Sequence, residues 1–100
     1  MKVQILQVKS KEVPLSWGRI LDARKDEVFQ ALRYEKLEHE SFHLFEDGGN
    51  TYAVFVTVGE GGKPDMSMPI NREHRKIMSE NFIREIACDT AYLFDASDKV

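Results

Sequence analysis

The feature that most constrains the fold is the stretch from residue 37 to 58, which has the pattern of a β-hairpin. Two runs rich in Phe, Val, Thr and Tyr flank Gly48 and Gly49, with Asp47 before them and Asn50 after them. Adjacent glycines supply the positive φ angles that a tight hairpin turn needs, and Asp and Asn are favoured beside them. A turn centred on the glycines predicts three cross-strand pairs: Phe45 with Tyr52, His43 with Val54, and Ser41 with Val56.

Alternation of side chains along the two runs predicts a sheet with apolar residues on both faces. One face carries Leu37, His39, Ser41, His43, Phe45, Tyr52, Val54, Val56 and Val58. The other carries Glu38, Glu40, Phe42, Leu44, Ala53, Phe55 and Thr57. A sheet with one solvated face would alternate more cleanly between apolar and polar residues, so both faces are expected to be covered. Helices can cover one face, and a second subunit is the natural candidate for the other.

The segments around the hairpin complete an α+β pattern. Residues 2–8 are short and rich in branched apolar residues, which predicts a strand. Ser10 and Pro14 are typical of a helix start, and an apolar stripe at helical spacing predicts one helix that ends near Arg33 or Tyr34. Residues 59–65 form a glycine-rich connector. A second helix is predicted to begin at residue 70, with Asn71 as its cap.

The C-terminal part has a weaker pattern. Residues 83–88 are compatible with either a helix end or a strand, residues 90–94 are predicted to form the last strand, and residues 95–100 form a polar tail. The predicted order is therefore βαββαβ in a single domain, residues 1–100. A four-stranded antiparallel sheet with two helices on one face is the ferredoxin-like arrangement. The apolar outer face predicts a homodimer, because self-complementary pairs are the commonest oligomers.

Composition narrows the functional classes. Of the residues, 42% are hydrophobic and 31% charged, and the net charge is −3, as in ordinary globular proteins. The basic residues are scattered, so nucleic acid is not an expected partner. No apolar run is long enough for a membrane span, and the N-terminus does not resemble a signal peptide. The lone Cys88 cannot form an internal disulfide, which favours a cytoplasmic location. It is expected to be a small buried residue.

Three stretches carry a resemblance to a known group: DGGNTYAVF, a glycine-rich loop with GGKP, and INREHRKIMSENF. They resemble small, functionally uncharacterised bacterial proteins of the dimeric α/β-barrel superfamily, which also contains antibiotic-biosynthesis and haem-degrading monooxygenases. The resemblance covers most of residues 32–82 and is sharpest at 70–74, which is similar to an Ile-Asp-Lys-Lys-His stretch. Glu40 falls where members of the group carry a Glu, whereas the C-terminal part departs from the pattern. The resemblance implies dimerisation through the sheet and a cleft beneath the helices, but no single chemistry.

The candidate site residues follow from these positions. Glu40 and His74 are the candidate catalytic pair, in which the carboxylate would orient the imidazole as a general base. The alternative is a buried, hydrogen-bonded structural pair. The predicted ligand-binding side chains are Trp17, Arg24, Phe42, Phe55 and Met78. His39 and His43 are separated by roughly 13 Å along a strand, so no metal site within one subunit and no cofactor are predicted.

Two classes of function remain open at this point. The first is a cofactor-independent monooxygenase- or isomerase-like enzyme with a small-molecule pocket between the sheet and the helices. The alternative is a non-catalytic ligand-binding or structural interaction protein whose interior is filled by its own side chains. A haem-binding protein is a third hypothesis. An empty cleft of several hundred Å³ near His74 would favour the first class, since ligand pockets have about that volume.

Overall fold

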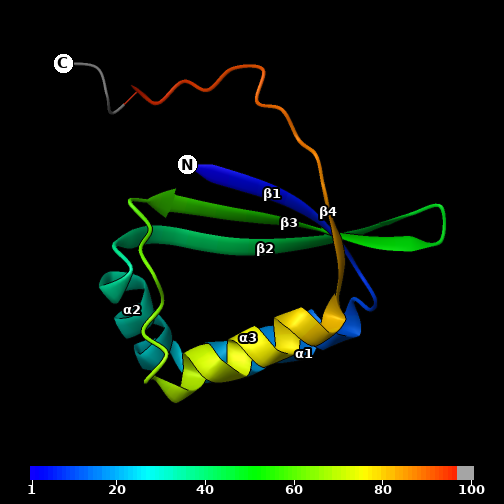
Figure 1. Ribbon diagram of the computed structural model, residues 1–100. Helices are drawn as coiled ribbons and strands as arrows, with labels where there is room; N and C mark the ends of the chain where they lie inside the picture. The colour runs from blue at the N-terminus through cyan, green and yellow to red at the C-terminus, as the bar shows by residue number, and fades with distance from the viewer. Residues whose placement is uncertain (97–100) are drawn as a thin grey trace.

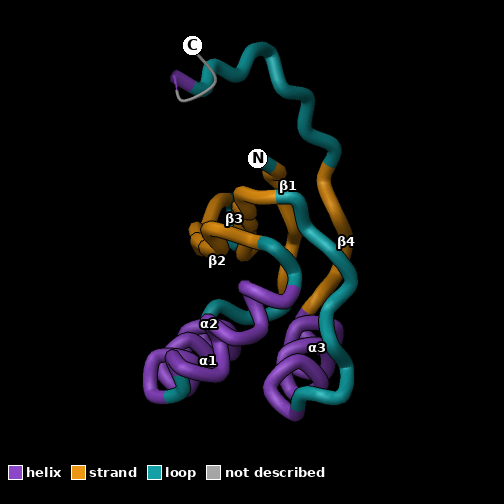
Figure 2. The backbone as a smooth tube through the Cα atoms, turned by 90° about the vertical axis from the view of Figure 1, so that its left-hand side faces the viewer, coloured by secondary structure: helices purple, strands orange, loops and turns teal. Residues whose placement is uncertain are grey.

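The computed structural model describes residues 1–96, which form a four-stranded antiparallel sheet and three helices (Figure 1). The strands are β1 (Lys2–Val8), β2 (Leu37–Asp47), β3 (Asn50–Gly59) and β4 (Phe82–Ile86). The helices are α1 (Glu12–Ala23), α2 (Lys25–Tyr34) and α3 (Pro69–Asn81). The strand order is β2-β3-β1-β4. All three helices lie on one side of the sheet, with α1 and α3 side by side (Figures 1 and 2).

The predicted hairpin is confirmed, including its register. Strands β2 and β3 pair antiparallel, and Ser41, His43 and Phe45 lie opposite their predicted partners. Gly48 and Gly49 have φ angles of 58° and 80°, as the tight turn requires. The pairing shifts by one residue between Leu37 and His39. Gly59 lies at this irregularity with a φ of 128°, and a Cβ there would collide with the carbonyl oxygen of Lys36.

The prediction of one long helix before the hairpin is wrong, because the chain breaks it into α1 and α2 at Arg24. This residue has φ −122° and ψ 38°, outside the helical region. Its guanidinium donates two hydrogen bonds to the Glu27 carboxylate, at 3.0 and 2.7 Å, and one to Glu73 of α3, at 2.8 Å. The apolar stripe does not reveal the break, because α1 and α2 both direct their apolar residues towards the same space. The chain therefore has three helices in its described part.

The start of α3 also differs from the prediction. The helix begins at Pro69, so Asn71 lies inside its first turn, and its side-chain amide donates to the Asp65 carbonyl at 2.9 Å. At the start of α1, Ser10 does contribute: its hydroxyl accepts a hydrogen bond from the Glu12 amide at 3.1 Å. Proline at the first turn of α3 fits, because that position needs no amide donor.

The last strand lies earlier than predicted. Residues 82–86 form β4 and pair with β1, with Ile86 opposite Ile5, whereas residues 90–94 form no strand. Arg84 and Glu85 obscure the apolar alternation, but each side chain bonds a glutamine of β1: Arg84 donates to Gln7, and Glu85 accepts from Gln4. Cys88 is exposed, contrary to the prediction. Of the predicted polar tail, residues 97–100 lie outside the described part.

The buried interior is small. The buried hydrophobic side chains among the described residues are Val8, Trp17, Ala31, Ala53 and Ile70. On the outer sheet face, β1 places Val3 and Ile5 opposite Val56 and Val54 of β3. Beyond β4 the chain runs on this outer side, away from the helices (Figures 1 and 2). No helix in residues 1–96 is both long and apolar enough to span a membrane.

Candidate ligand-binding site

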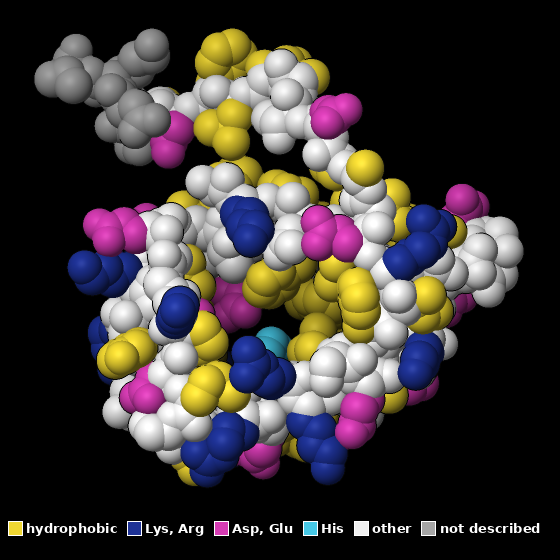
Figure 3. All heavy atoms as spheres, in the orientation of Figure 1, with side chains coloured by type: hydrophobic (Ala, Val, Ile, Leu, Met, Phe, Trp, Pro, Cys, Tyr) yellow, Lys and Arg dark blue, Asp and Glu magenta, His cyan; other side chains and the backbone are white. Residues whose placement is uncertain are grey.

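A cavity of about 750 Å³ lies between the sheet and the three helices. Figure 3 shows it as a hollow with hydrophobic side chains around it and acidic and histidine atoms visible inside. Its walls combine the inner sheet face with side chains of α1, α2 and α3. The lining residues include Trp17, Gly18, Leu21, Val28, Leu32, Glu35, Glu40, Phe42, Phe55, Ile70, His74, Arg75 and Met78.

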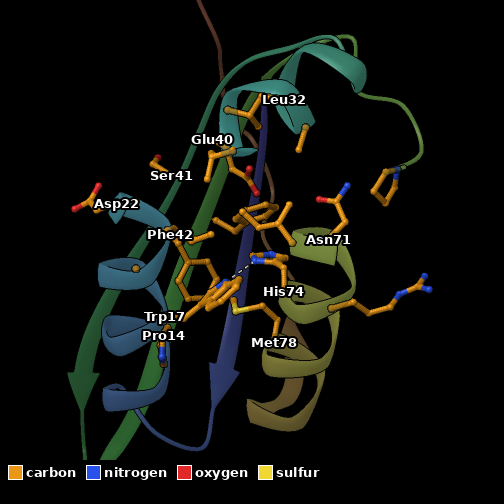
Figure 4. A pocket seen from close by; sticks show the side chains of 18 of the residues that line it. Pro14, Trp17, Asp22, Leu32, Glu40, Ser41, Phe42, Asn71, His74 and Met78 are labelled. Atoms are coloured by element: carbon orange, nitrogen blue, oxygen red, sulfur yellow. Dashed lines mark hydrogen bonds between the residues drawn. The ribbon is translucent and has the colours of Figure 1, made fainter. Parts of the chain in front are cut away.

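The apolar wall is built from residues that the chain brings together from distant positions. Phe42 of β2 and Phe55 of β3 are cross-strand partners, and their ring centroids are 5.9 Å apart. Trp17 of α1 is 4% exposed and faces them from the helical side, with Met78 of α3 nearby (Figure 4). All four are predicted ligand-binding residues, and all four line the cavity.

A hydrogen bond between Trp17 and His74 joins α1 to α3. The indole Nε1–H donates to His74 Nδ1 at 2.9 Å (Figure 4). Because an indole nitrogen can only donate, Nδ1 must be the unprotonated nitrogen, and in the neutral ring the proton is on Nε2. Burial lowers the pKa of His74 below its usual 6.5. Protonation of Nδ1 would also break the bond to Trp17. His74 is therefore held as a neutral imidazole with a donor at Nε2.

Two carboxyl groups, those of Glu40 and Glu35, line the same cavity. The Glu40 carboxylate points into it (Figure 4). The Glu40 side chain is exposed to the hollow, yet the protein atoms around it remove part of its hydration, and this desolvation raises the pKa of Glu40, with the negative charge of Glu35 as a second cause. Burial also raises the pKa of Glu35. These groups therefore ionise less readily than ordinary glutamates.

Glu40 and His74 line one cavity but do not form a bonded pair. Within residues 1–96 no hydrogen bond connects the two side chains, and neither carboxyl group of the Glu35/Glu40 pair has a donor or a cation as partner. The imidazole takes Trp17 as its partner instead. The carboxylate consequently does not orient the ring, and both polar groups are free to meet a ligand.

Arg24 lies away from this group of residues. It is absent from the cavity lining and is paired with Glu27 and Glu73, which closes the corner between α2 and α3. The hydrogen bond from Arg24 lowers the pKa of Glu27. The structure thus uses Arg24 to connect helices at the break, and places the other predicted site residues around the cavity.

His39 and His43 lie on the outer sheet face, where their rings lean towards the side chain between them. Nε2 of each is 2.9 Å from the Ser41 hydroxyl oxygen, one from either side. A hydroxyl can donate to one ring and accept from the other. No group of three or more His, Cys, Asp or Glu residues in the described chain is arranged to hold a metal ion.

Two elements of the site were not predicted from the sequence. Glu35 follows the last turn of α2 and belongs to no motif, so nothing marked it as a partner of Glu40. The Trp17–His74 hydrogen bond joins residues that are 57 positions apart. Trp17 and His74 both lie on predicted apolar stripes. The stripes indicate which face of each helix these residues occupy, but not that the two residues bond to each other.

Comparisons with protein-family models, with curated proteins and with solved structures find no match to this chain. Membership of the dimeric α/β-barrel superfamily therefore stays a prediction, and the function has to be inferred from the site itself.

Proposed function

We propose that this protein binds a small, largely apolar organic molecule in the cavity between its sheet and its helices. The observation that carries the proposal is the cavity of about 750 Å³ with His74 in its wall. Ligand pockets typically have volumes of roughly 300–1,000 Å³, apolar walls and a few convergent polar groups. Trp17, Phe42 and Phe55 supply the apolar surface, while Glu40 and His74 supply an acceptor and a donor. A protein whose interior is filled by its own side chains would lack this space.

A second candidate function is proton transfer of the isomerase-like kind, the step with which a cofactor-independent monooxygenase would also begin. Its support is the combination of a carboxyl group of raised pKa at Glu40 and a neutral imidazole donor at His74. Glu40 would take a proton from a carbon beside a carbonyl group, and the electron pair would move to the carbonyl oxygen. His74 Nε2–H would donate to that oxygen, as neutral imidazoles can. Return of the proton to another carbon would complete an isomerisation.

His74 does not fit the role of a haem ligand. An iron ligand must present a ring nitrogen without a proton. In this structure Nδ1 accepts from Trp17, and Nε2 carries the proton of the neutral ring. Binding iron would require the imidazole to break its bond to Trp17 or to lose a second proton. We accordingly expect hemin added to the purified protein to give no Soret shift that depends on His74.

We further propose a ferredoxin-like arrangement in which α1 and α2 together take the place of the first helix, and a homodimer formed through the outer sheet face. Val54 and Val56 lie on the face that no helix covers, with Phe45 and Tyr52 stacked beside them at 5.3 Å between ring centroids. A second copy of the same face would cover this apolar surface.

Fluorescence of the chain's single tryptophan tests the binding proposal, because Trp17 lies in the cavity wall. A neutral aromatic quencher, 4-nitrobenzyl alcohol, should quench it saturably. The Gly18→Leu variant should bind at least about tenfold more weakly, since Gly18 lines the cavity and its Cβ would meet no atom within 4 Å, leaving the larger side chain to fill the space. Ser79→Leu, on the exposed side of α3, is the matched control. Unsaturable quenching, or equal binding by Gly18→Leu, would contradict the proposal.

A further inference from the structure

Building on the proposed function of the cavity, we propose that its ligand is a cation: a protonated amine carried on an apolar or aromatic body. Glu35 and Glu40 would bind the ammonium group, and the aromatic wall would hold the body. The class of ligand follows from the absence of a counterion at these two side chains and from the charge and aromatic character of the groups around them.

The two carboxyl groups face one cavity without a counterion. Both line it, and the Glu40 carboxylate is directed into its interior (Figure 4). Desolvation raises the pKa of Glu40, and the negative charge of Glu35 raises it further. Like charges in a partly desolvated space are unfavourable, and an ammonium between them would reverse the sign of the interaction.

The basic side chains at positions 19, 24 and 36 have other partners. Lys36, which follows Glu35 in sequence, pairs with Glu60 at 3.6 Å. Arg24 pairs with Glu27 and Glu73. Arg19 lines the cavity from an exposed position, and its guanidinium donates to Ser16 at 3.2 Å.

Arg75 also lines the cavity from an exposed position. Neither it nor Arg19 forms an ion pair with Glu35 or Glu40 in residues 1–96. The acidic pair is thus left for a cation that enters from outside.

The helix end and the aromatic rings around the two carboxyl groups also favour a positively charged ligand. Helix α2 ends at Tyr34, beside Glu35, so the negative end of its dipole adds to the two carboxyl groups. The rings of Trp17 and Phe42 line the same space, and aromatic faces attract ammonium groups. In this arrangement Glu40 is a binding group and not a general base. The inference therefore favours ligand binding over isomerase-like chemistry.

Three quenchers of matched size and different charge test the inference: 4-nitrobenzylamine as its ammonium form, 4-nitrobenzyl alcohol, and 4-nitrobenzoate. Each is titrated at pH 7 against the full chain, with Trp17 fluorescence as the readout. We expect the ammonium to bind about tenfold or more tightly than the alcohol, because hydrogen bonds to a charged group exceed neutral ones by roughly that factor. The benzoate should bind most weakly.

Variants distinguish the effect of the Glu35/Glu40 pair from the effect of the protein's overall negative charge. Glu35→Gln and Glu40→Gln should each reduce the preference for the ammonium, and the double variant should abolish it while still binding the alcohol. Glu38→Gln removes the same charge from β2 at a position outside the cavity lining, and should keep the preference. Equal binding of all three quenchers would overturn the cation inference and leave the proposed function standing. Binding of none would overturn both.

Discussion

At the level of single residues, the bond from Trp17 to His74 decides what the histidine can do. Sequence periodicity identified both as members of apolar helical stripes, and both line the cavity. It predicted a carboxylate as the partner of His74, however, and the partner is an indole. An indole N–H and a carboxylate impose opposite tautomers on an imidazole. Periodicity indicates which face of a helix a residue occupies, but not which atom of another helix it will meet. The indole partner of His74 could therefore not be predicted.

The Trp17→Phe substitution should raise the pKa of His74. Phenylalanine keeps an aromatic ring in the wall but removes the donor to Nδ1, so the imidazolium can form without losing a hydrogen bond. Proton NMR titration of the histidine ring signals measures this directly. In the wild type, His74 should titrate below 6.5, the usual value from which burial lowers its pKa. An unchanged His74 pKa in the variant would show that burial alone determines it.

The Glu40→Gln substitution should stabilise the ligand-free protein at neutral pH. The folded state raises the pKa of Glu40 above its usual 4.5, so it holds this proton more tightly than the unfolded chain does. Stability linked to this proton is present below about pH 4.5 and is lost as the pH rises through the folded-state pKa.

We expect the variant to gain only about 0.5 kcal/mol in free energy of unfolding at pH 7, because Glu40 is exposed to the hollow and solvent screens its charge, and little at pH 4. Urea unfolding at the two pH values measures the difference, with Glu38→Gln as the control. A gain of equal size at both pH values would argue against the assigned cause.

At the level of elements, the hairpin turn and its three predicted cross-strand pairs were predictable, because turn chemistry and alternation act locally, whereas the irregularity between Leu37 and His39 was not. The helix break and the last strand were not. Arg24, at the break, contacts Glu73, 49 positions away, and β4 pairs with β1, whose glutamines bond Arg84 and Glu85. Interactions between distant segments override local preference in both places. The aromatic residues of 90–94 have a pattern typical of a strand, but they are exposed and form no strand.

Asn81 fastens the end of α3 to the link between β1 and α1. It is 5% exposed, its side chain accepts from the Ser10 amide at 3.0 Å and donates to the Ser10 carbonyl at 2.8 Å, and its own carbonyl accepts from the Lys9 amide at 2.8 Å. Asn81→Ala should cost about 2–3 kcal/mol of unfolding free energy, because it leaves two backbone groups without partners. Chemical denaturation measures the loss, and Ser79→Ala, exposed on the same helix, should cost far less. Similar values for both variants would refute this role of Asn81.

At the level of the whole molecule, the chain is more open than its length requires. Its radius of gyration is 14.6 Å. A compact domain of this length would have about 13 Å. The segment after β4 runs away from the helices and adds to this extent (Figures 1 and 2), and the cavity leaves space between the sheet and the helices. Alternation in the hairpin predicted apolar side chains on both faces, but no local pattern could predict the volume between the sheet and the helices.

Val54→Glu should convert the proposed dimer into a monomer. The substitution places a charge at the centre of the outer face, where a second copy would have to bury it without a partner. Light scattering coupled to size exclusion should give twice the 11.6 kDa chain mass for the wild type and close to that mass for the variant. Phe29→Glu, at a half-exposed position on α2, should leave the mass unchanged. A wild-type protein at the single-chain mass would refute the interface.

The two ends of α3 are each held in place, by different kinds of contact. Its C-terminal end is pinned by the Asn81 bonds, whereas the segment before Pro69 is a long connector containing Gly61 and Gly62. The N-terminal end is held by Ile70, which is 3% exposed, and by the ion pair from Arg24 to Glu73. His74 lies between these two anchors. A guest that enters the hollow therefore meets an imidazole donor on a helix that is held at both ends.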